Sequence, residues 1–243
     1  MVDVDCNGVI FRNVDAIVFD KDGTIADSHL YLHRLGEKRA NFIESEVPGV
    51  RNAILTAFGI VENWIDPTGL LAVGSREENE QAIATLIENS ALISNAAPLV
   101  QAAFLKADQT LQRRAELTHP FAGIPALLQT LSKSCKLGIV SSDSEPNIRE
   151  FVDRYELSSF FGSIVGAQPG LSKPDPRLLK AACFKLNVAP SATLIIGDAI
   201  ADVELAHQGG AIGCVAVTWG GVHSLKNADA IVNEPSQIQL IAR

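Results

Sequence analysis

The sequence predicts an α/β protein: a Rossmann-like parallel sheet with helices on both faces, plus an inserted all-helical domain. After residue 120, short apolar runs rich in β-branched residues alternate with helical patterns, as in βα units. Between residues 28 and 117 such runs are missing, and apolar residues recur at helical intervals. We therefore assign residues 1–27 and 118–243 to the core domain and residues 28–117 to a helical domain.

Composition limits the class of protein. The chain has 243 residues, of which 47% are hydrophobic and 20% charged, as expected for folded globular domains. The net charge is -8 and no basic stripe is present, so we expect no nucleic-acid partner. The N-terminus lacks the pattern of a signal peptide and no apolar run could span a membrane, so we expect a cytoplasmic protein. Four cysteines without CxxC spacing are expected to be buried free thiols, with no zinc site.

The first core strand is Ala16–Phe19, a continuous apolar run of the kind buried on both faces of a parallel sheet. It leads into Asp20 and Asp22, which an extended chain would place on one face. Two crowded carboxylates indicate a metal ion, proton transfer or both, and a solvated acidic turn is the alternative. Lys21, between them, is expected on the other face with no catalytic role, and Gly23 permits a sharp turn.

The helical domain is expected to contain four helices. Apolar spacing places one around Leu30 to Ile43, and Gly59 ends a second that begins at Val50. Ser75 and Glu78 form a capping-box pattern for a helix that continues to Glu88. A last helix is expected from Pro98 to Leu117, and residues 67–76 are expected to form an apolar loop.

The remaining core elements follow in βα order. The expected strands are 136–143, 163–166, 193–196, 212–217 and 230–232. The expected helices are 125–132, 146–157, 176–186 and 201–208. A short run at 9–11 is either an edge strand or an N-terminal arm.

Polar side chains follow several of these strands. Because parallel α/β sheets bind ligands beyond the carboxyl ends of their strands, we expect these side chains to meet at one rim. The residues are Asp20, Asp22, Ser141, Ser142, Asp198 and Asp202, joined by Lys173, which lies in a segment with two prolines just before an expected helix. Asp143 and Asp175 are expected to be solvated helix caps instead.

Four segments together resemble the motifs of the haloacid dehalogenase-like hydrolase superfamily, in the same order. They are Asp20-Lys21-Asp22-Gly23-Thr24, Ile139-Val140-Ser141-Ser142, Lys173-Pro174-Asp175-Pro176 and Gly197-Asp198-Ala199-Ile200-Ala201-Asp202. The helical insert resembles the C1 cap of this superfamily. Trp219-Gly220 adds a similarity to the phosphoglycolate-phosphatase-like branch.

The resemblance implies a Mg²⁺-dependent phosphatase that acts on a small phosphorylated metabolite, such as phosphoglycolate or a sugar phosphate. Asp20 would be the nucleophile that forms an aspartyl-phosphate, and Asp22 the general acid and base. Mg²⁺ would be bound by Asp20, the backbone carbonyl of Asp22 and Asp198, with Asp202 holding its waters or the lysine. The phosphate would be bound by Gly23, Thr24, Ser141, Ser142 and Lys173.

Two alternatives stay open: a sugar phosphomutase with the same chemistry, and a catalytically idle binding module. Arg51 and Arg76 of the helical domain are candidates to meet the leaving group of the substrate. The sequence carries no signal for the oligomeric state.

Overall fold

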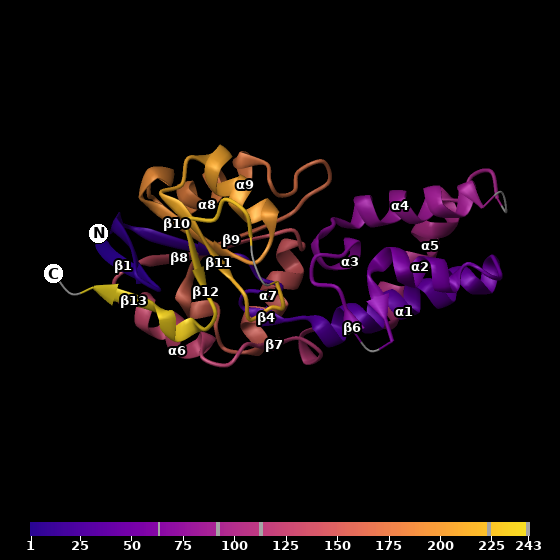
Figure 1. Cartoon of the computed structure of the whole chain (residues 1–243), viewed down its shortest axis with the longest axis horizontal. Helices are drawn as coiled ribbons and strands as arrows, with labels where there is room; N and C mark the ends of the chain where they lie inside the picture. The colour runs from indigo at the N-terminus through magenta and orange to yellow at the C-terminus, as the bar shows by residue number, and fades with distance from the viewer. Residues whose placement is uncertain (63, 91–92, 112–113, 223–224, 242–243) are drawn as a thin grey trace. The chain divides into compact units, whose positions relative to one another are not determined.

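The computed structural model describes every residue except 63, 91–92, 112–113, 223–224 and 242–243 (Figure 1). The described chain forms two compact units. One unit comprises Met1–Asp27 and His119–Arg243, and the other comprises Ser28–Thr118.

The first unit is built on a six-stranded parallel sheet. Its strand order is β12-β11-β10-β3-β8-β9, so β3 lies at the centre of the sheet. The strands are β3 (Ala16–Phe19), β8 (Lys136–Ser141), β9 (Phe161–Gly166), β10 (Thr193–Gly197), β11 (Gly213–Val217) and β12 (Ala230–Val232). The predicted parallel sheet is confirmed, and the helical insert lies in the chain between β3 and β8.

Helices cover both faces of this sheet (Figure 1). They are α6 (Ile124–Leu131), α7 (Glu145–Arg154), α8 (Pro176–Leu186) and α9 (Ile200–Gly209). Alternate residues of β3 face opposite layers: Ile17 and Phe19 pack with α6 and α7, whereas Ala16 and Val18 pack with α8 and α9. All four are buried, which explains why this strand reads as a continuous apolar run.

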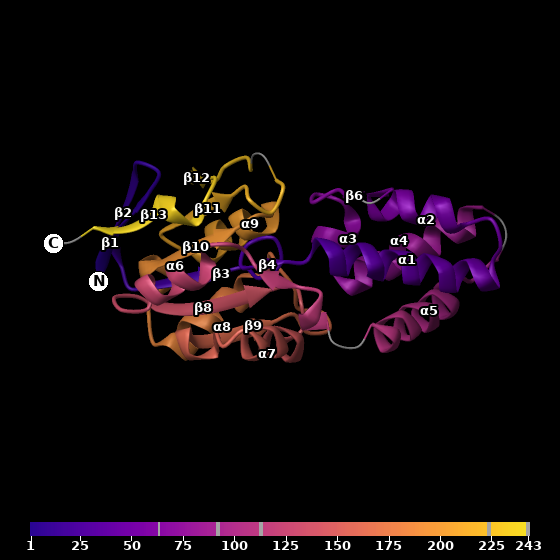
Figure 2. The same ribbon diagram turned by 90° about the horizontal axis from the view of Figure 1, so that it is seen from below.

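A second, antiparallel sheet joins the two ends of the chain. Its order is β13-β1-β2, so β1 (Val2–Cys6) pairs with both β2 (Val9–Val14) and β13 (Ile238–Ile241) (Figure 2). The run at 9–11 is therefore a strand that pairs with its predecessor. Two short strands, β4 (Ala26–Asp27) and β7 (His119–Pro120), pair within the same unit.

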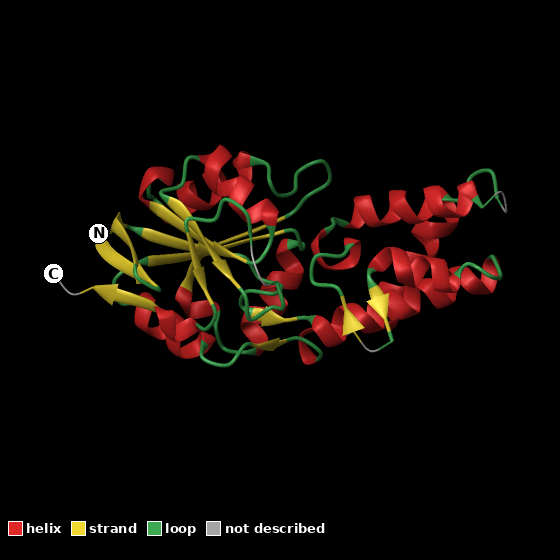
Figure 3. Cartoon of the chain, viewed as in Figure 1, coloured by secondary structure: helices red, strands yellow, loops and turns green. Residues whose placement is uncertain are grey.

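The second unit is mainly helical (Figure 3). Its helices are α1 (His29–Glu46), α2 (Arg51–Phe58), α3 (Leu70–Val73), α4 (Arg76–Asn89) and α5 (Ala97–Thr110). Ser75 caps α4 as expected, since its side chain accepts from the Glu78 N–H and the Glu78 carboxylate accepts from the Ser75 N–H. Gly59 ends α2 in a left-handed conformation with φ of 80°.

Three expectations for this unit are wrong. It is not all helical, because β5 (Ile60–Val61) and β6 (Trp64–Ile65) pair antiparallel after Gly59 turns the chain. The segment expected as a loop contains α3, whose Leu71 is buried in the core of the unit. Helix α5 ends at Thr110, and a 3₁₀ turn at Arg114–Glu116 follows instead of a continuous helix.

All four cysteines are buried free thiols, as expected. Among the described residues, none of the helices has the length and apolar character needed to cross a membrane.

Candidate active site

Two neighbouring strands at the centre of the parallel sheet each end in an aspartate. Asp20 follows β3 and Asp198 follows β10, and these strands pair in parallel register. From β3 the chain proceeds to β8 and β9 on one side of the sheet, and then to β10, β11 and β12 on the other. The carboxyl ends of β3 and β10 therefore flank the topological switch point, where open α/β sheets bind ligands.

Two glycines let the backbone approach these carboxylates closely. Gly23 has φ of 81°, and a Cβ there would lie 1.9 Å from Asp198 Oδ2. A Cβ on Gly197 would lie 2.3 Å from the carboxylate of Asp202. Any larger residue at either position would displace an aspartate, which explains why glycines stand next to the acidic residues in both motifs.

Four charged side chains form one buried cluster, which we call the carboxylate cluster: Asp20, Asp198, Asp202 and Lys173. The Lys173 ammonium donates to Asp20 Oδ1 at 2.6 Å and to Asp202 Oδ1 at 2.7 Å. The Thr24 hydroxyl donates to Asp198 Oδ1 at 3.3 Å. Asp202 lies in the first turn of α9, where its other oxygen accepts from the Ala199 N–H at 3.1 Å. Of the residues expected to meet at one rim, the structure brings these four charged residues into direct contact or close proximity.

Burial and mutual repulsion raise the pKa values of the carboxyls. Burial is the main cause at Asp20, and although Lys173 opposes it, the pKa rises to about 7. Burial, with the charges of Asp20 and Asp202, also raises the pKa of Asp198 well above its usual range. Burial alone would lower the pKa of Lys173, but its two carboxylate partners outweigh burial and raise it. One ammonium therefore does not balance three carboxylates.

The carboxylate cluster fits a divalent cation. Ligand oxygens of Asp20, Asp198 and Asp202 all lie within 4.8 Å of one another, and all three side chains are buried. Carboxylate oxygens are the ligands that Mg²⁺ prefers, and three such charges against one lysine leave two negative charges for a divalent ion to neutralise. The residues present can thus hold the expected metal.

The two motif aspartates do not share one environment. Asp22 lies outside the strand, because β3 ends at Phe19 and a turn begins at Lys21. Its carboxylate accepts from the Lys21 ammonium at 2.6 Å, and Lys21 also lies 3.3 Å from Asp143 Oδ2. The expectation that Lys21 points to the other face is wrong, since it assumed an extended chain through Asp22.

Asp143 is likewise not a solvated cap. Its side chain is 9% exposed, and its Oδ1 accepts from the Ser144 N–H and the Asn147 amide, both at 2.8 Å. Asp143 lies two residues after Ser141, at the same edge of the sheet, and this position in the sequence could have indicated that it lies near the site. Asp175 does cap α8, because its side chain accepts from the Arg177 N–H at 2.9 Å.

The expected phosphate contacts lie in different settings. Ser141 is buried at the end of β8, beside β3, and its hydroxyl accepts from the Asp143 N–H at 3.2 Å. Ser142 follows it and is half-buried. The N–H groups of Gly23 and Thr24 already donate within the turn, to Ala26 O and Lys21 O.

The two candidate arginines of the helical unit are paired there. Arg51 donates to Asn41 Oδ1 at 2.7 Å and lies 3.5 Å from Glu37. Arg76 pairs with Glu80 at 2.7 Å and with Asp108. Contact of either arginine with substrate stays a prediction.

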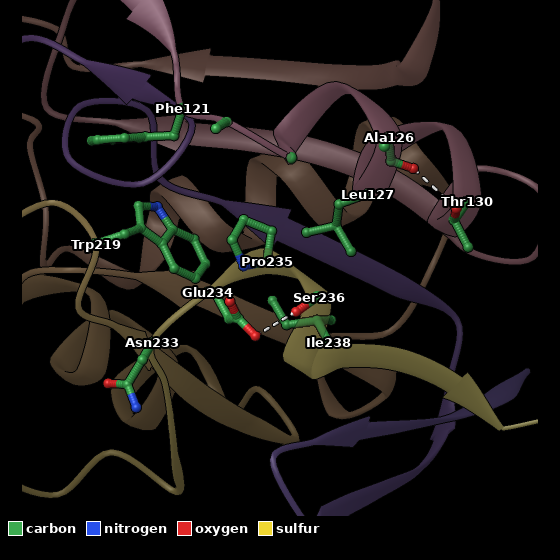
Figure 4. A pocket seen from close by; sticks show the side chains of 12 residues that line it. Phe121, Ala126, Leu127, Thr130, Trp219, Asn233, Glu234, Pro235, Ser236 and Ile238 are labelled. Atoms are coloured by element: carbon green, nitrogen blue, oxygen red, sulfur yellow. Dashed lines mark hydrogen bonds between the residues drawn. The ribbon is translucent and has the colours of Figure 1, made fainter.

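Trp219, singled out in the sequence, supports the turn after Asp22. Its indole N–H donates to Thr24 O at 2.8 Å. Trp219 also borders a cavity of about 670 Å³ together with Phe121, Leu127 and Pro235 (Figure 4). No residue of the carboxylate cluster lines this cavity. The link between Trp219 and the site is therefore its hydrogen bond to the turn at Thr24.

Comparison with known proteins agrees with this geometry. The family described as haloacid dehalogenase-like hydrolase matches residues 14–210. The chain is 33% identical over 214 residues to a phosphoglycolate phosphatase of Synechococcus elongatus, covering 85% of each chain. It is 30% identical over 138 residues to an N-acetylmuramic acid 6-phosphate phosphatase of Pseudomonas aeruginosa, covering 54% of this chain and 61% of the relative.

Solved structures share the fold. The crystal structure of a predicted phosphoglycolate phosphatase from Haemophilus somnus superimposes with a TM-score of 0.67 at 18% identity, covering 93% of this chain and 96% of the other. The match to the family spans the strand ends that carry Asp20 and Asp198 as well as Lys173 and Asp202. The chain belongs to the haloacid dehalogenase-like hydrolase family and is similar to its phosphoglycolate-phosphatase-like members.

Proposed function

We propose that this enzyme is a Mg²⁺-dependent phosphatase that hydrolyses a small phosphate monoester through an aspartyl-phosphate on Asp20. The observation that carries the proposal is the carboxylate cluster, in which Asp20 lies 2.6 Å from a buried lysine and beside two further buried carboxylates. Membership of a hydrolase family supports the reaction class, and curated relatives that act on phosphate monoesters support the phosphate.

Electrostatics explain why the substrate needs these residues. A phosphate monoester brings about two negative charges at neutral pH to a site that is already anionic. Lys173 contacts the proposed nucleophile Asp20 and would also contact an incoming phosphoryl oxygen, and the Ser141 hydroxyl would donate a hydrogen bond to another. Bound to Asp20, Asp198 and the carbonyl of Asp22, Mg²⁺ would neutralise the remaining charge and orient the phosphate. Gly23 and Thr24 shape the turn, and Ser142 lies at the same sheet edge.

The chemical steps assign different tasks to the two motif aspartates. A carboxylate oxygen of Asp20 attacks phosphorus, and the bond from phosphorus to the ester oxygen breaks. Asp22 gives a proton to the departing alkoxide, which leaves as an alcohol. Asp22 then accepts a proton from a water that attacks the aspartyl-phosphate, which releases inorganic phosphate and restores Asp20.

The substrate class is proposed from the relatives. Phosphoglycolate and sugar phosphates are both small phosphate esters of alcohols, and the names of the similar proteins include both kinds. Such esters have poor leaving groups, which is consistent with a second carboxylate dedicated to proton transfer.

The test is release of inorganic phosphate from 2-phosphoglycolate, N-acetylmuramic acid 6-phosphate, several sugar phosphates and p-nitrophenyl phosphate. We expect turnover with Mg²⁺, none after EDTA, and recovery when Mg²⁺ is restored. Asp20→Asn should retain the fold and lose at least about 10³-fold in kcat, the scale on which loss of a nucleophile acts in other hydrolases. Activity without a metal, or full activity of Asp20→Asn, would refute the mechanism. A requirement for a sugar bisphosphate would identify a phosphomutase instead.

A further inference from the structure

The loop that follows β11 packs directly against the turn that carries the first motif. The Trp219 indole N–H donates to Thr24 O at 2.8 Å. A Cβ on the next residue, Gly220, would lie 2.3 Å from Gly23 O, so the backbones of the loop and the turn are in close contact. Two consecutive residues of the loop thus contact two consecutive residues of the turn.

Hydrogen bonds attach the same loop to the end of the neighbouring strand, β12. The Thr218 N–H donates to Val232 O at 3.1 Å, and the Thr218 hydroxyl donates to Asn233 Oδ1 at 2.8 Å. The Gly221 N–H donates to Thr218 O at 3.0 Å and closes the loop. Trp219 therefore contacts the turn from a loop that is itself fixed to the sheet.

The turn also contacts Asp198, a proposed ligand of the metal. The Thr24 hydroxyl donates to Asp198 Oδ1 at 3.3 Å, and a Cβ on Gly23 would lie 1.9 Å from Asp198 Oδ2. Both oxygens of this carboxylate therefore lie against the turn. Because Thr24 is fully buried, its hydroxyl needs a partner within the protein, and the position of its backbone decides which partner it reaches.

We propose that Trp219 is a positioning residue for the metal site: by holding the Thr24 carbonyl, it places the Thr24 hydroxyl that orients the Asp198 carboxylate. The inference rests on the proposed function, since it takes Asp198 as a ligand of Mg²⁺. Hydrogen-bond partners behind a metal ligand orient it, and their removal typically lowers metal affinity by about 10- to 100-fold. Trp219 acts on such a partner and not on the ligand, so its removal should cost less.

Trp219→Phe tests the contact with Thr24, because it removes the indole N–H and keeps an aromatic ring. Calorimetric titration of the metal-free protein should show Mg²⁺ binding about three- to tenfold weaker than in the wild type. Phe121→Leu is the matched control. The Phe121 side chain borders the same cavity as Trp219 but carries no hydrogen-bond donor, so this substitution changes packing alone (Figure 4). Its Mg²⁺ affinity should stay within about twofold of the wild type.

Thr24→Val tests the contact with Asp198, because it removes the hydroxyl and preserves the shape of the side chain. We expect Mg²⁺ binding about tenfold weaker, and recovery to within about threefold in Thr24→Ser, which keeps a hydroxyl. The double variant Trp219→Phe/Thr24→Val should bind Mg²⁺ almost as well as Thr24→Val, since Trp219 then has no hydroxyl to place. Losses that multiply in the double variant would show two independent effects and overturn the inference.

The NMR resonance of the Trp219 indole N–H gives a readout that does not depend on activity. The chain has two tryptophans, and Trp64 lies in the helical unit with 53% of its surface exposed. Mg²⁺ should shift the Trp219 resonance of the wild type and leave that of Trp64 in place, with Trp64→Phe assigning the two signals.

Two results would overturn the inference: a Trp219 resonance that Mg²⁺ does not shift, or unchanged Mg²⁺ affinity in Trp219→Phe. If Trp219→Phe does not fold, the resonance of the wild type decides. A wild type that binds no Mg²⁺ would instead refute the metal dependence in the proposed function, and this inference with it.

Discussion

Each unit of the molecule contains a cluster of charged residues, and the two clusters are balanced differently. In the helical unit, Asp108 pairs with both Arg39 and Arg76, and Arg76 also pairs with Glu80. The Arg39 guanidinium stacks 4.0 Å from the centre of the Phe104 ring. Two positive charges thus meet two negative charges, and the group has no net charge to offer to a ligand.

The carboxylate cluster of the core unit has three negative charges and one positive charge. Burial without sufficient opposite charge raises the pKa of Asp20 to about 7. The difference teaches that burial of charge alone does not indicate function. By contrast, a buried charge that lacks an opposite charge, at a position where ligands bind, does indicate function. Such a charge lowers the stability of the fold, and function is the reason to keep it.

Replacement of Lys173 should have the largest effect. Its side chain is 4% exposed and contacts Asp20 and Asp202, so Lys173→Met leaves three buried carboxylates without their ammonium. We expect kcat to fall by about 10³-fold and the metal-free protein to lose about 3 kcal/mol of stability, as when one partner of a buried ion pair is removed.

Phosphate release and thermal unfolding would measure both effects. Lys136→Met is the control, because Lys136 begins β8 at the opposite end of the sheet and donates to Leu186 O. Activity of Lys173→Met within tenfold of the wild type would show that the imbalance of the carboxylate cluster serves another purpose.

Replacement of Asp108 should affect stability and leave the chemistry intact. In Asp108→Asn, Arg39 loses its partner in a buried position. We expect a loss of about 2 kcal/mol, below the value for a fully buried pair because Asp108 is 32% exposed, with kcat within about twofold of the wild type. Urea unfolding and steady-state kinetics test this. A large increase in KM with unchanged stability would instead show that Arg76 binds substrate, as the sequence suggested.

We also expect the stability of the metal-free protein to depend on pH. The pKa of Asp20 is raised from an ordinary 3.8 to about 7, chiefly by burial, so between these values the folded metal-free protein holds a proton that the unfolded chain has released. The stability that protonated Asp20 contributes to the metal-free protein is therefore present at low pH and is lost as the pH rises through about 7. With Mg²⁺ bound, the carboxylate is ionised and the loss should disappear.

Thermal unfolding in EDTA and in Mg²⁺, from about pH 5.5 to about pH 8.5, measures this dependence. The increase in Tm caused by Mg²⁺ should grow with pH in the wild type. In Asp20→Asn the growth should be weaker, because the titrating group is absent. An increase that is constant with pH in the wild type would contradict the assigned cause.

Residues at strand ends were predictable from sequence because the parallel sheet brings the ends of distant strands together. Prediction of Asp20 and Asp198 required only that two apolar runs be recognised as strands, together with the rule that ligands bind at the carboxyl edge of such a sheet. Lys173 lies on a loop and was found through its motif. The contact of Lys21 with Asp22 was missed, because an extended geometry was assumed where the chain already turns.

Pairing between distant segments was also beyond local patterns. Strand β1 has aspartates at alternate positions and pairs with β13 near the other end of the chain. No local sequence pattern indicates this pairing. The β5–β6 pair is only two residues long on each side, too short to leave a periodic pattern. The balanced group around Asp108 depends on helix packing, since Asp108 and Arg39 are 69 residues apart.

Calorimetric titration of the metal-free protein with Mg²⁺ tests most directly whether the imbalance of the carboxylate cluster creates a cation site. The account predicts one Mg²⁺ per chain for the wild type and for Asp108→Asn. In Asp198→Asn, with its fold checked by thermal unfolding, the affinity should fall by at least about tenfold, as expected when a ligand oxygen of a metal is altered. Equal affinity in the wild type and Asp198→Asn, or no Mg²⁺ binding to the wild type, would contradict it.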